Sequence, residues 1–421
     1  MEKDYNEKMV AKKALRGYIT LRFFSDLLFA VFSTVNLVYQ ATVVGLNPFQ
    51  LVLVGALLES TTFIFEVPTG IVADLYSRKL SVLIGVVLVG LGFVLEGSIP
   101  VFESVLIAQV IWGFGYTFIS GAREAWIADE VGEKNAGAVF IKAGQFAQAG
   151  TFIGIALSMA LANIDIRIPI IVAGILYAAQ AIFIALFMHE YNFVPTPAQK
   201  RETFQSMKNV FIKGTELVRK SRVLLVIIAT AAIYGVFSEG FDRLWTPFML
   251  QSFTFPAIGN VKPVVWFGII SLAATLLAVV ITESFRHKVN SSNHRSTVKA
   301  LFFVNLLLVV SVAGFALAGN FMVAAALYCG AEAFRRVRQP VFDAWANQNV
   351  TSSVRATVLS MCSQADAIGQ VVGGPILGLI ATVVALKVSL LAAALILTPT
   401  LFFYLYSIRN HKLLQASSRA L

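Results

Sequence analysis

The chain has 421 residues, of which 57% are hydrophobic and 13% are charged, and its formal net charge is +10. A soluble domain averages about 45–50% apolar and about 25% charged residues, so this composition excludes an ordinary soluble protein. The positive charge does not indicate nucleic acid, because the basic residues gather in short segments between long apolar runs, as on the cytoplasmic face of a membrane protein.

Apolar runs recur along the whole chain. A bilayer-crossing α-helix needs about 20 apolar residues, and runs of this length predict twelve spans. The expected spans are about 17–42, 48–70, 80–98, 102–128, 137–162, 167–188, 223–250, 263–284, 298–318, 321–346, 355–383 and 387–408. The short connections leave no room for a soluble domain. We therefore expect an all-α polytopic membrane protein.

The first two expected spans carry charges that need a reason. In the first, Arg22 and Asp26 share one helical stripe with three polar residues, and in the second, Glu59 shares a stripe with Glu66. An ionisable side chain near a helix centre costs about 2.5–3.5 kcal/mol on insertion scales. A substrate or proton site is one explanation, and a buried ion pair between Arg22 and Asp26 is the other.

A glycine-led, charged segment, 70–79, separates the second and third spans. It reads Gly-Ile-Val-Ala-Asp-Leu-Tyr-Ser-Arg-Lys and resembles the loop G-x-x-x-D-x-x-G-R-K of the major facilitator superfamily. The matching residues are Gly70, Asp74, Arg78 and Lys79. Ser77 replaces the second glycine of that pattern. In the resembled family this loop locks the outward-facing state, so the resemblance implies a gating role.

The fourth span ends in a charged pair, Arg123 and Glu124. Together with Arg338 and Asp343 of the tenth span, they are expected to form salt bridges with the 70–79 loop that close the cytoplasmic side. Many drug exporters of the resembled family carry an arginine, linked to proton transfer, where this chain has Gln109. If protons couple here, a carboxylate must carry them.

A polar connector, 190–222, divides the chain into six spans and six spans. The predicted parts are an N-terminal bundle (1–189), a cytoplasmic connector with a surface helix (190–222) and a C-terminal bundle (223–421). A shift of 219 residues carries Glu124-Ala125-Trp126 onto Asp343-Ala344-Trp345. The same shift relates Gln145 to Gln364, Gly150 to Gly369 and Gly154 to Gly373. Two pseudo-symmetric six-helix bundles, as in the resembled family's fold, are therefore expected.

Charges in the second half give further candidates. Glu239, Asp242 and Arg243 lie in the outer half of the seventh span, where an outer gate and a substrate contact are equally plausible. The residues expected to bind substrate or protons are Arg22, Asp26, Glu59, Glu332, Arg336 and Asp366. Buried structural pairing is the alternative for each of them. The third, sixth, ninth and twelfth spans are almost entirely apolar. In the resembled family the helices at these positions face lipid, and the resemblance implies the same here.

The distribution of basic residues predicts the topology. The segments on one side hold most lysines and arginines, whereas the opposite loops hold only Arg167, Lys262 and Lys387. Both termini should therefore be cytoplasmic, in a plasma or inner membrane. The first apolar segment carries Arg22 and Asp26, which a cleavable signal peptide would exclude. Cys329 and Cys362 fall inside spans, where a packing role is expected.

The sequence has no G-x-x-x-x-G-K-[ST] loop for ATP, and we expect neither an enzyme nor a cofactor or metal site. All four histidines lie in expected cytoplasmic segments, so carboxylates must carry any protons. The resemblance implies a monomeric secondary transporter that works by alternating access on a small-molecule substrate. The leading hypothesis is proton-coupled export of amphipathic or cationic small molecules, as in drug and metabolite exporters. The first alternative is uptake of an anionic nutrient or metabolite held by Arg22, Arg336 and Arg338. The second is a membrane receptor or lipid-translocating scaffold.

Overall fold

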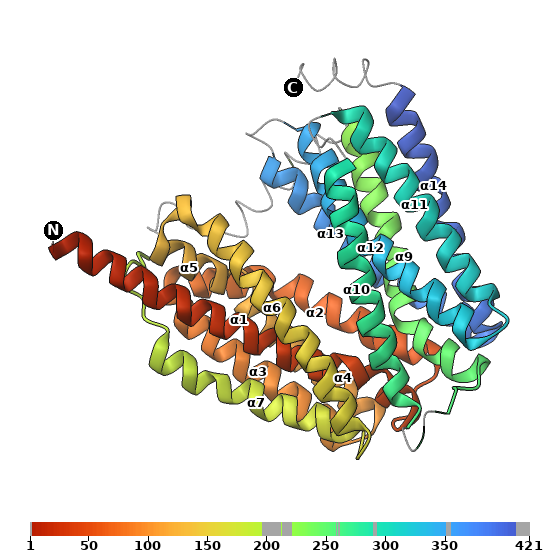
Figure 1. Cartoon of the computed structure of the whole chain (residues 1–421), viewed down its shortest axis with the longest axis horizontal. Helices are drawn as coiled ribbons and strands as arrows, with labels where there is room; N and C mark the ends of the chain where they lie inside the picture. The colour runs from red at the N-terminus through yellow and green to blue at the C-terminus, as the bar shows by residue number, and fades with distance from the viewer. Residues whose placement is uncertain are drawn as a thin grey trace. The chain divides into compact units, whose positions relative to one another are not determined.

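The computed structural model of the chain describes residues 2–195, 212, 221–257, 259, 262–288, 293–350 and 355–409, and throughout them the regular structure is helical (Figure 1). The helices are α1 (Glu2–Thr42), α2 (Pro48–Leu75), α3 (Arg78–Ser98), α4 (Phe102–Ile119), α5 (Ala122–Val131), α6 (Glu133–Ala162), α7 (Arg167–Phe187), α9 (Arg222–Ser252), α10 (Val264–Lys288), α11 (His294–Leu317), α12 (Phe321–Gln348), α13 (Arg355–Val383) and α14 (Leu386–Arg409). The expected all-α fold is confirmed. Most of the 190–222 connector, with its expected surface helix, lies outside the described residues.

The chain divides into two compact units. The first comprises the described residues of Met1–Gly45, Leu57–Arg201 and Ala257–Gly268. The second comprises those of Leu46–Ala56, Glu202–Pro256 and Ile269–Leu421. Helix α2 therefore contributes its first turns to one unit and the rest of its length to the other.

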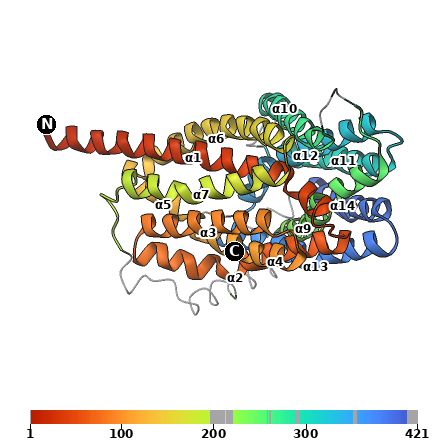
Figure 2. The ribbon, with the colours of Figure 1, turned by 90° about the horizontal axis from the view of Figure 1, so that it is seen from below.

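Each unit is built on a few long helix pairs. In the first, α1 packs along α6, and α3 packs against both α4 and α7 (Figure 2). In the second, α9 packs along α13, and α11 packs against α12 and α14. The core of the second unit includes the fully buried Trp345 and Tyr404, with Phe342 beside them.

The repeat seen in the sequence reappears in this packing. A Cβ added to Gly150 of α6 would meet the backbone carbonyl of Phe23 in α1, and one added to Gly369 of α13 would meet that of Ala232 in α9. Glycines at such crossings let two backbones approach closely. One turn further along each helix, a Cβ on Gly154 would meet the backbone carbonyl of Leu27, and one on Gly373 would meet the side chain of Val236. The glycines that the 219-residue shift relates therefore hold equivalent helix pairs together.

Among the described residues, eleven helical segments are long and apolar enough to cross a membrane. They include α4 and α5 together as one segment, Phe102–Val131. Helix α12 is not among them, because seven consecutive residues of this helix, 332–338, include four charged ones. These are Glu332, Arg335, Arg336 and Arg338. It is nevertheless as long as its neighbours, with 28 residues.

The fourth expected span is broken. Helix α4 ends at Ile119, and α5 begins at Ala122 after Ser120 and Gly121, with Gly121 at φ 75°. A residue with a side chain rarely adopts this left-handed backbone conformation, whereas glycine does so readily. Helix α5 therefore starts anew after the break, and it carries Arg123 and Glu124 in its first turn.

Candidate functional site

A four-residue ion cluster lies in the first unit, where α5 meets α1. Arg22 Nε is 3.4 Å from an Asp26 carboxylate oxygen, and Arg22 Nη1 is 3.8 Å from Glu124 Oε1. Arg123 Nη2 lies 3.1 Å from the same Glu124 oxygen. Two guanidinium groups thus meet two carboxylates, and the cluster carries no net charge. Glu124, in the first turn of α5, also faces the positive end of that helix.

A second ion network surrounds the 70–79 loop. Arg78 pairs with Asp74 one turn earlier, and its Nε is 3.6 Å from Asp129 of α5. Its guanidinium also lies over the ring of Phe193, 5.7 Å from the centroid. The cationic end of this loop is therefore held by α5.

Ser77, which replaces the glycine of the family pattern, has a defined task. Its hydroxyl accepts a hydrogen bond from the Leu80 amide and so caps α3, and it donates to Glu190 Oε2 at 2.6 Å. Glu190 Oε1 also accepts from the Lys79 amide. Nearby, Glu130 Oε1 accepts the amides of Tyr191 and Asn192. The segment after α7 is thereby fastened to the start of α3 and the end of α5.

A third polar cluster lies in the second unit, around Arg335 of α12. Arg335 Nη1 contacts both Asp242 of α9 and Glu332, the latter at 2.6 Å, and Nη2 donates to Asp242 Oδ2 at 2.8 Å. Its Nε donates to the Tyr234 hydroxyl at 3.2 Å. Two carboxylates share one guanidinium, so this cluster holds one negative charge in excess.

Aromatic rings line this cluster. Arg335 lies over Phe237 and Phe241, 5.8 Å from each centroid. Further along α9, Trp245 stacks on Tyr328 with centroids 4.0 Å apart. Asp242 is the open member of the cluster, because its side chain is 45% exposed against 14% for Arg335.

Arg338 is buried one turn further along α12. It is 2% exposed, and its guanidinium stacks 3.7 Å from the Tyr234 centroid and 4.9 Å from that of Phe342. Its Nε and Nη2 have no hydrogen-bond partner among the described residues. Asp343, expected to join Arg338 in the cytoplasmic gate, accepts a hydrogen bond from Gln339 and also lies within electrostatic reach of Arg338.

Glu239 and Arg243 of α9 form a pair at 3.0 Å, with Glu239 only 4% exposed. A Cβ on Gly55 of α2 would collide with both side chains, and one on Gly374 of α13 would press on Glu239. The pair therefore occupies a slot that two glycines leave open.

The structure distributes the remaining candidates as follows. Asp366 of α13 accepts a hydrogen bond from Gln370 at 2.8 Å. Glu59 is half-buried on α2, and Arg336 is exposed. A Cβ on Gly70 would meet nothing within 4 Å. Among the described residues, no three His, Cys, Asp or Glu side chains gather in a way that could hold a metal ion.

Sequence reasoning grouped some of these charges differently. Arg123 and Glu124 were expected beside Asp74 and Arg78, whereas the structure places them with Arg22. It missed Arg335, the centre of the third cluster, in favour of its neighbour Arg336. The signal for Arg335 was present, because Glu332 lies three residues before it on the same helical face.

The third span was expected to be almost entirely apolar. Helix α3 nevertheless carries one acid, Glu96, which is 0% exposed.

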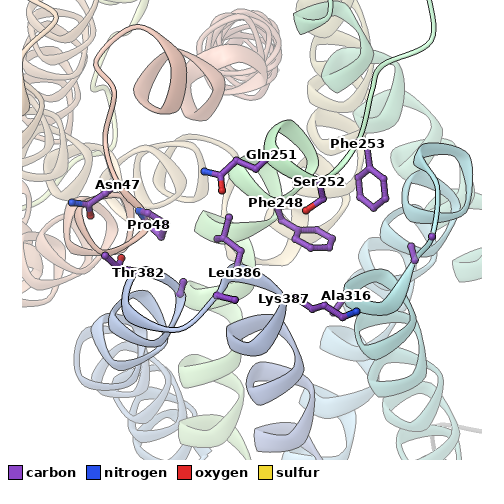
Figure 3. Close-up of a pocket in the computed structure, with 14 residues that line it drawn as sticks. Asn47, Pro48, Phe248, Gln251, Ser252, Phe253, Ala316, Thr382, Leu386 and Lys387 are labelled. Atoms are coloured by element: carbon purple, nitrogen blue, oxygen red, sulfur yellow. The ribbon is translucent and has the colours of Figure 1, made fainter.

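A cavity of about 690 Å³ opens at one end of the second unit (Figure 3). It is lined by the first residues of α2 and α14 and the last residues of α9, α11 and α13, including Asn47, Phe248, Gln251 and Lys387. It contains none of the charged residues of the Arg335 cluster.

Comparison with known proteins decides the family. The model of the Major Facilitator Superfamily matches residues 19–334. The chain belongs to this superfamily. A curated relative, described as an uncharacterized MFS-type transporter YxaM of Bacillus subtilis (strain 168), is 25% identical over 366 residues, covering 84% of this chain and 86% of that protein.

Solved structures of superfamily type share the fold. The nucleoside transporter NupG aligns over 93% of this chain and 98% of its own, with a TM-score of 0.72 and 13% identity. A mutant peptide transporter POT in complex with alafosfalin aligns over 98% and 99%, with a TM-score of 0.75 and 12% identity. A bacterial homologue of the lysosomal transporter Spinster aligns over 98% of both chains, with a TM-score of 0.66 and 12% identity. At these identities the likeness concerns the fold, and family and fold together identify a multi-pass membrane transporter.

Proposed function

We propose that this facilitator-superfamily protein is a proton-coupled exporter of amphipathic, cationic small molecules that works by alternating access in the plasma membrane. The observation that carries the proposal is the Arg335 cluster. Its two carboxylates share one guanidinium, and Asp242 is both the more exposed acid and a direct partner of Arg335.

The excess negative charge supports the choice of a cation. A site with one uncompensated carboxylate is stabilised by taking up a proton or a substrate cation, but it gains less from both at once. The two ligands then compete for Asp242, and such competition is the basis of exchange. Trp245 and Tyr328 add aromatic faces, which attract organic cations.

The energy of the proton gradient is sufficient. One charge moving through 100 mV contributes about 2.3 kcal/mol, and each 1.4 kcal/mol corresponds to a tenfold concentration ratio. A single coupled proton therefore sustains a gradient of roughly fifty-fold.

Everted membrane vesicles test the proposal. After acidification, adding tetraphenylphosphonium or ethidium should dissipate part of the pH gradient in wild-type vesicles. Asp242→Asn should abolish this response, whereas Glu124→Gln, in the balanced cluster of the first unit, should retain most of it. No response to a broad panel of cations from folded wild-type protein would overturn the proposal.

One observation favours a second candidate, the uptake of an anionic metabolite. The buried Arg338 offers two donors, Nε and Nη2, that no described residue accepts. A carboxylate or phosphate forms strong bonds to such a group. Accumulation of radiolabelled carboxylates in whole cells, lost in Arg338→Ala but kept in Asp242→Asn, would support uptake in place of export.

A further inference from the structure

Two arginines of α12, Arg335 and Arg338, lie three residues apart and therefore on the same side of the helix. Arg335 contacts two carboxylates, those of Asp242 and Glu332. The guanidinium of Arg338 instead rests on an aromatic ring, 3.7 Å from the centroid of Tyr234. The spacing along α12 does not explain this difference, so its cause must lie in a neighbouring helix.

Tyr234 of α9 contacts both arginines. Its hydroxyl oxygen accepts a hydrogen bond from Arg335 Nε at 3.2 Å. Its ring turns one face to the Arg338 guanidinium. The face of an aromatic ring carries the negative part of its quadrupole, and it therefore attracts a cation. One side chain of α9 thus holds Arg335 by its oxygen atom and Arg338 by its ring.

Arg338 has charge partners outside the Arg335 cluster. It acts electrostatically on Asp343 of α12 and on Asp366 of α13. A second ring, that of Phe342, lies with its centroid 4.9 Å from the same guanidinium. The Arg335 cluster consequently keeps two carboxylates for one guanidinium. If Arg338 joined these carboxylates, the charges of the cluster would cancel.

We infer that Tyr234 is a positioning residue that holds Arg338 away from the two carboxylates of the Arg335 cluster. The cluster thereby keeps its negative charge. Without the ring, the long and flexible Arg338 side chain loses the surface on which it rests, and the two carboxylates attract it. This positioning holds whatever the protein transports. Only its consequence, a higher affinity of the cluster for cations, rests on the proposed function.

Thermal unfolding of the purified full-length protein in lipid nanodiscs tests the positioning without any substrate. Arg335→Gln should lower the unfolding temperature strongly in the wild-type background, because two carboxylates lose their cation. In the Tyr234→Leu background, the same substitution should cause at most about half of that loss, because Arg338 takes the place of Arg335. When Arg338→Gln is added to Tyr234→Leu, Arg335→Gln should again cause its full loss.

Phe342→Leu is the matched control, because it removes the other ring from Arg338 and leaves Tyr234 in place. In its background, Arg335→Gln should keep its full effect. Tyr234→Met fills a similar volume without a ring, and it serves for the same comparison if Tyr234→Leu does not fold. An equal loss from Arg335→Gln in every background would overturn the inference.

Binding of radiolabelled tetraphenylphosphonium to the same proteins tests the consequence for cations. Tyr234→Leu should weaken binding at least tenfold. Tyr234→Leu combined with Arg338→Gln should bind within threefold of the wild type, because no second guanidinium is left to neutralise the carboxylates. A loss that this second substitution does not rescue would contradict an action of Tyr234 through Arg338. A wild type that binds no cation, together with the expected unfolding results, would uphold the positioning and contradict the proposed function.

Discussion

In the first unit, Arg22 and Arg123 meet Asp26 and Glu124, so two cations face two carboxylates. In the second, Arg335 alone meets Asp242 and Glu332. The helix pairs beneath these clusters are equivalent, because Gly150 and Gly369 make the same close crossings. The charges are not equivalent. The two repeats therefore share their helix packing and differ in their ion pairs.

The difference suggests a division of labour. In the cluster around Arg22, the nitrogen–oxygen distances are 3.1–3.8 Å and the formal charges cancel. This cluster therefore needs no further ion. The cluster around Arg335 has closer contacts but one guanidinium for two carboxylates, so it lacks one positive charge. We therefore expect the second unit to respond to protons and cations more strongly than the first.

The largest expected effect is that of Arg335→Ala. Its removal leaves Asp242 and Glu332 without their shared cation, and because Asp242 is partly exposed we expect the low end of the cost of breaking a buried pair, about 3 kcal/mol. Thermal unfolding in detergent should show that loss, and transport should fall at least tenfold. Arg336→Ala, at the exposed neighbour, should stay within about 0.5 kcal/mol of wild type. Equal effects of the two substitutions would contradict the assignment of Arg335 as the centre.

The shared packing predicts a second result. Gly150→Ala and Gly369→Ala should each cost about 2 kcal/mol, because the new Cβ meets a backbone carbonyl that cannot move aside. Gly144→Ala, on the same helix as Gly150 but with nothing within 4 Å, should be neutral or slightly stabilising. The measurement is the thermal unfolding temperature of each of the three variants, compared with that of the wild type. A large effect in one unit and none in the other would disprove the equivalence.

Helix α2 offers a pair within one element. Gly55→Ala should destabilise by about 1 kcal/mol, because its Cβ collides with the side chains of Glu239 and Arg243, which can shift in part. Gly70→Ala should change stability by less than about 0.5 kcal/mol, since its surroundings are open. Denaturation curves measure the loss of stability in each variant. A larger loss in Gly70→Ala than in Gly55→Ala would show that the side chains of Glu239 and Arg243 are not tightly packed against Gly55.

The smallest effect is expected in the balanced cluster. A double-mutant cycle of Arg22→Gln and Asp26→Asn should give a coupling energy of at most about 1 kcal/mol, because both side chains are about 30% exposed. The quantity to measure is unfolding free energy at low and high salt. Coupling above about 2 kcal/mol would place this cluster on a level with that of Arg335.

The sequence predicted the helices and the repeat because both are local signals. Long apolar runs mark spans, and one shift aligned Trp126 with Trp345, which are 2% and 0% exposed in their own units. The break in the fourth span was less visible. A Ser-Gly dipeptide, at Ser120 and Gly121, was its signal, but apolar residues on both sides concealed it.

The sites were harder to predict because they depend on helix phase and on distant partners. Arg335 and Arg336 lie three and four residues after Glu332, so both fit the same helical rule and only the packing distinguishes them. Glu96 is a single acid at the end of an apolar run. Its partners Gln40 and Gln109 lie on other helices, and no spacing along the chain indicates that they meet.

The ten residues of α5 have one more consequence. This helix holds Glu124 against Arg22 at its beginning and Asp129 against Arg78 near its end, roughly 7.5 Å apart along its axis at 1.5 Å per residue. A helix of ten residues moves as a rigid body, and Gly121 directly before it is the hinge. A tilt of α5 that separates Glu124 from Arg22 must therefore also change the distance between Asp129 and Arg78. The helix thus couples the two ion pairs.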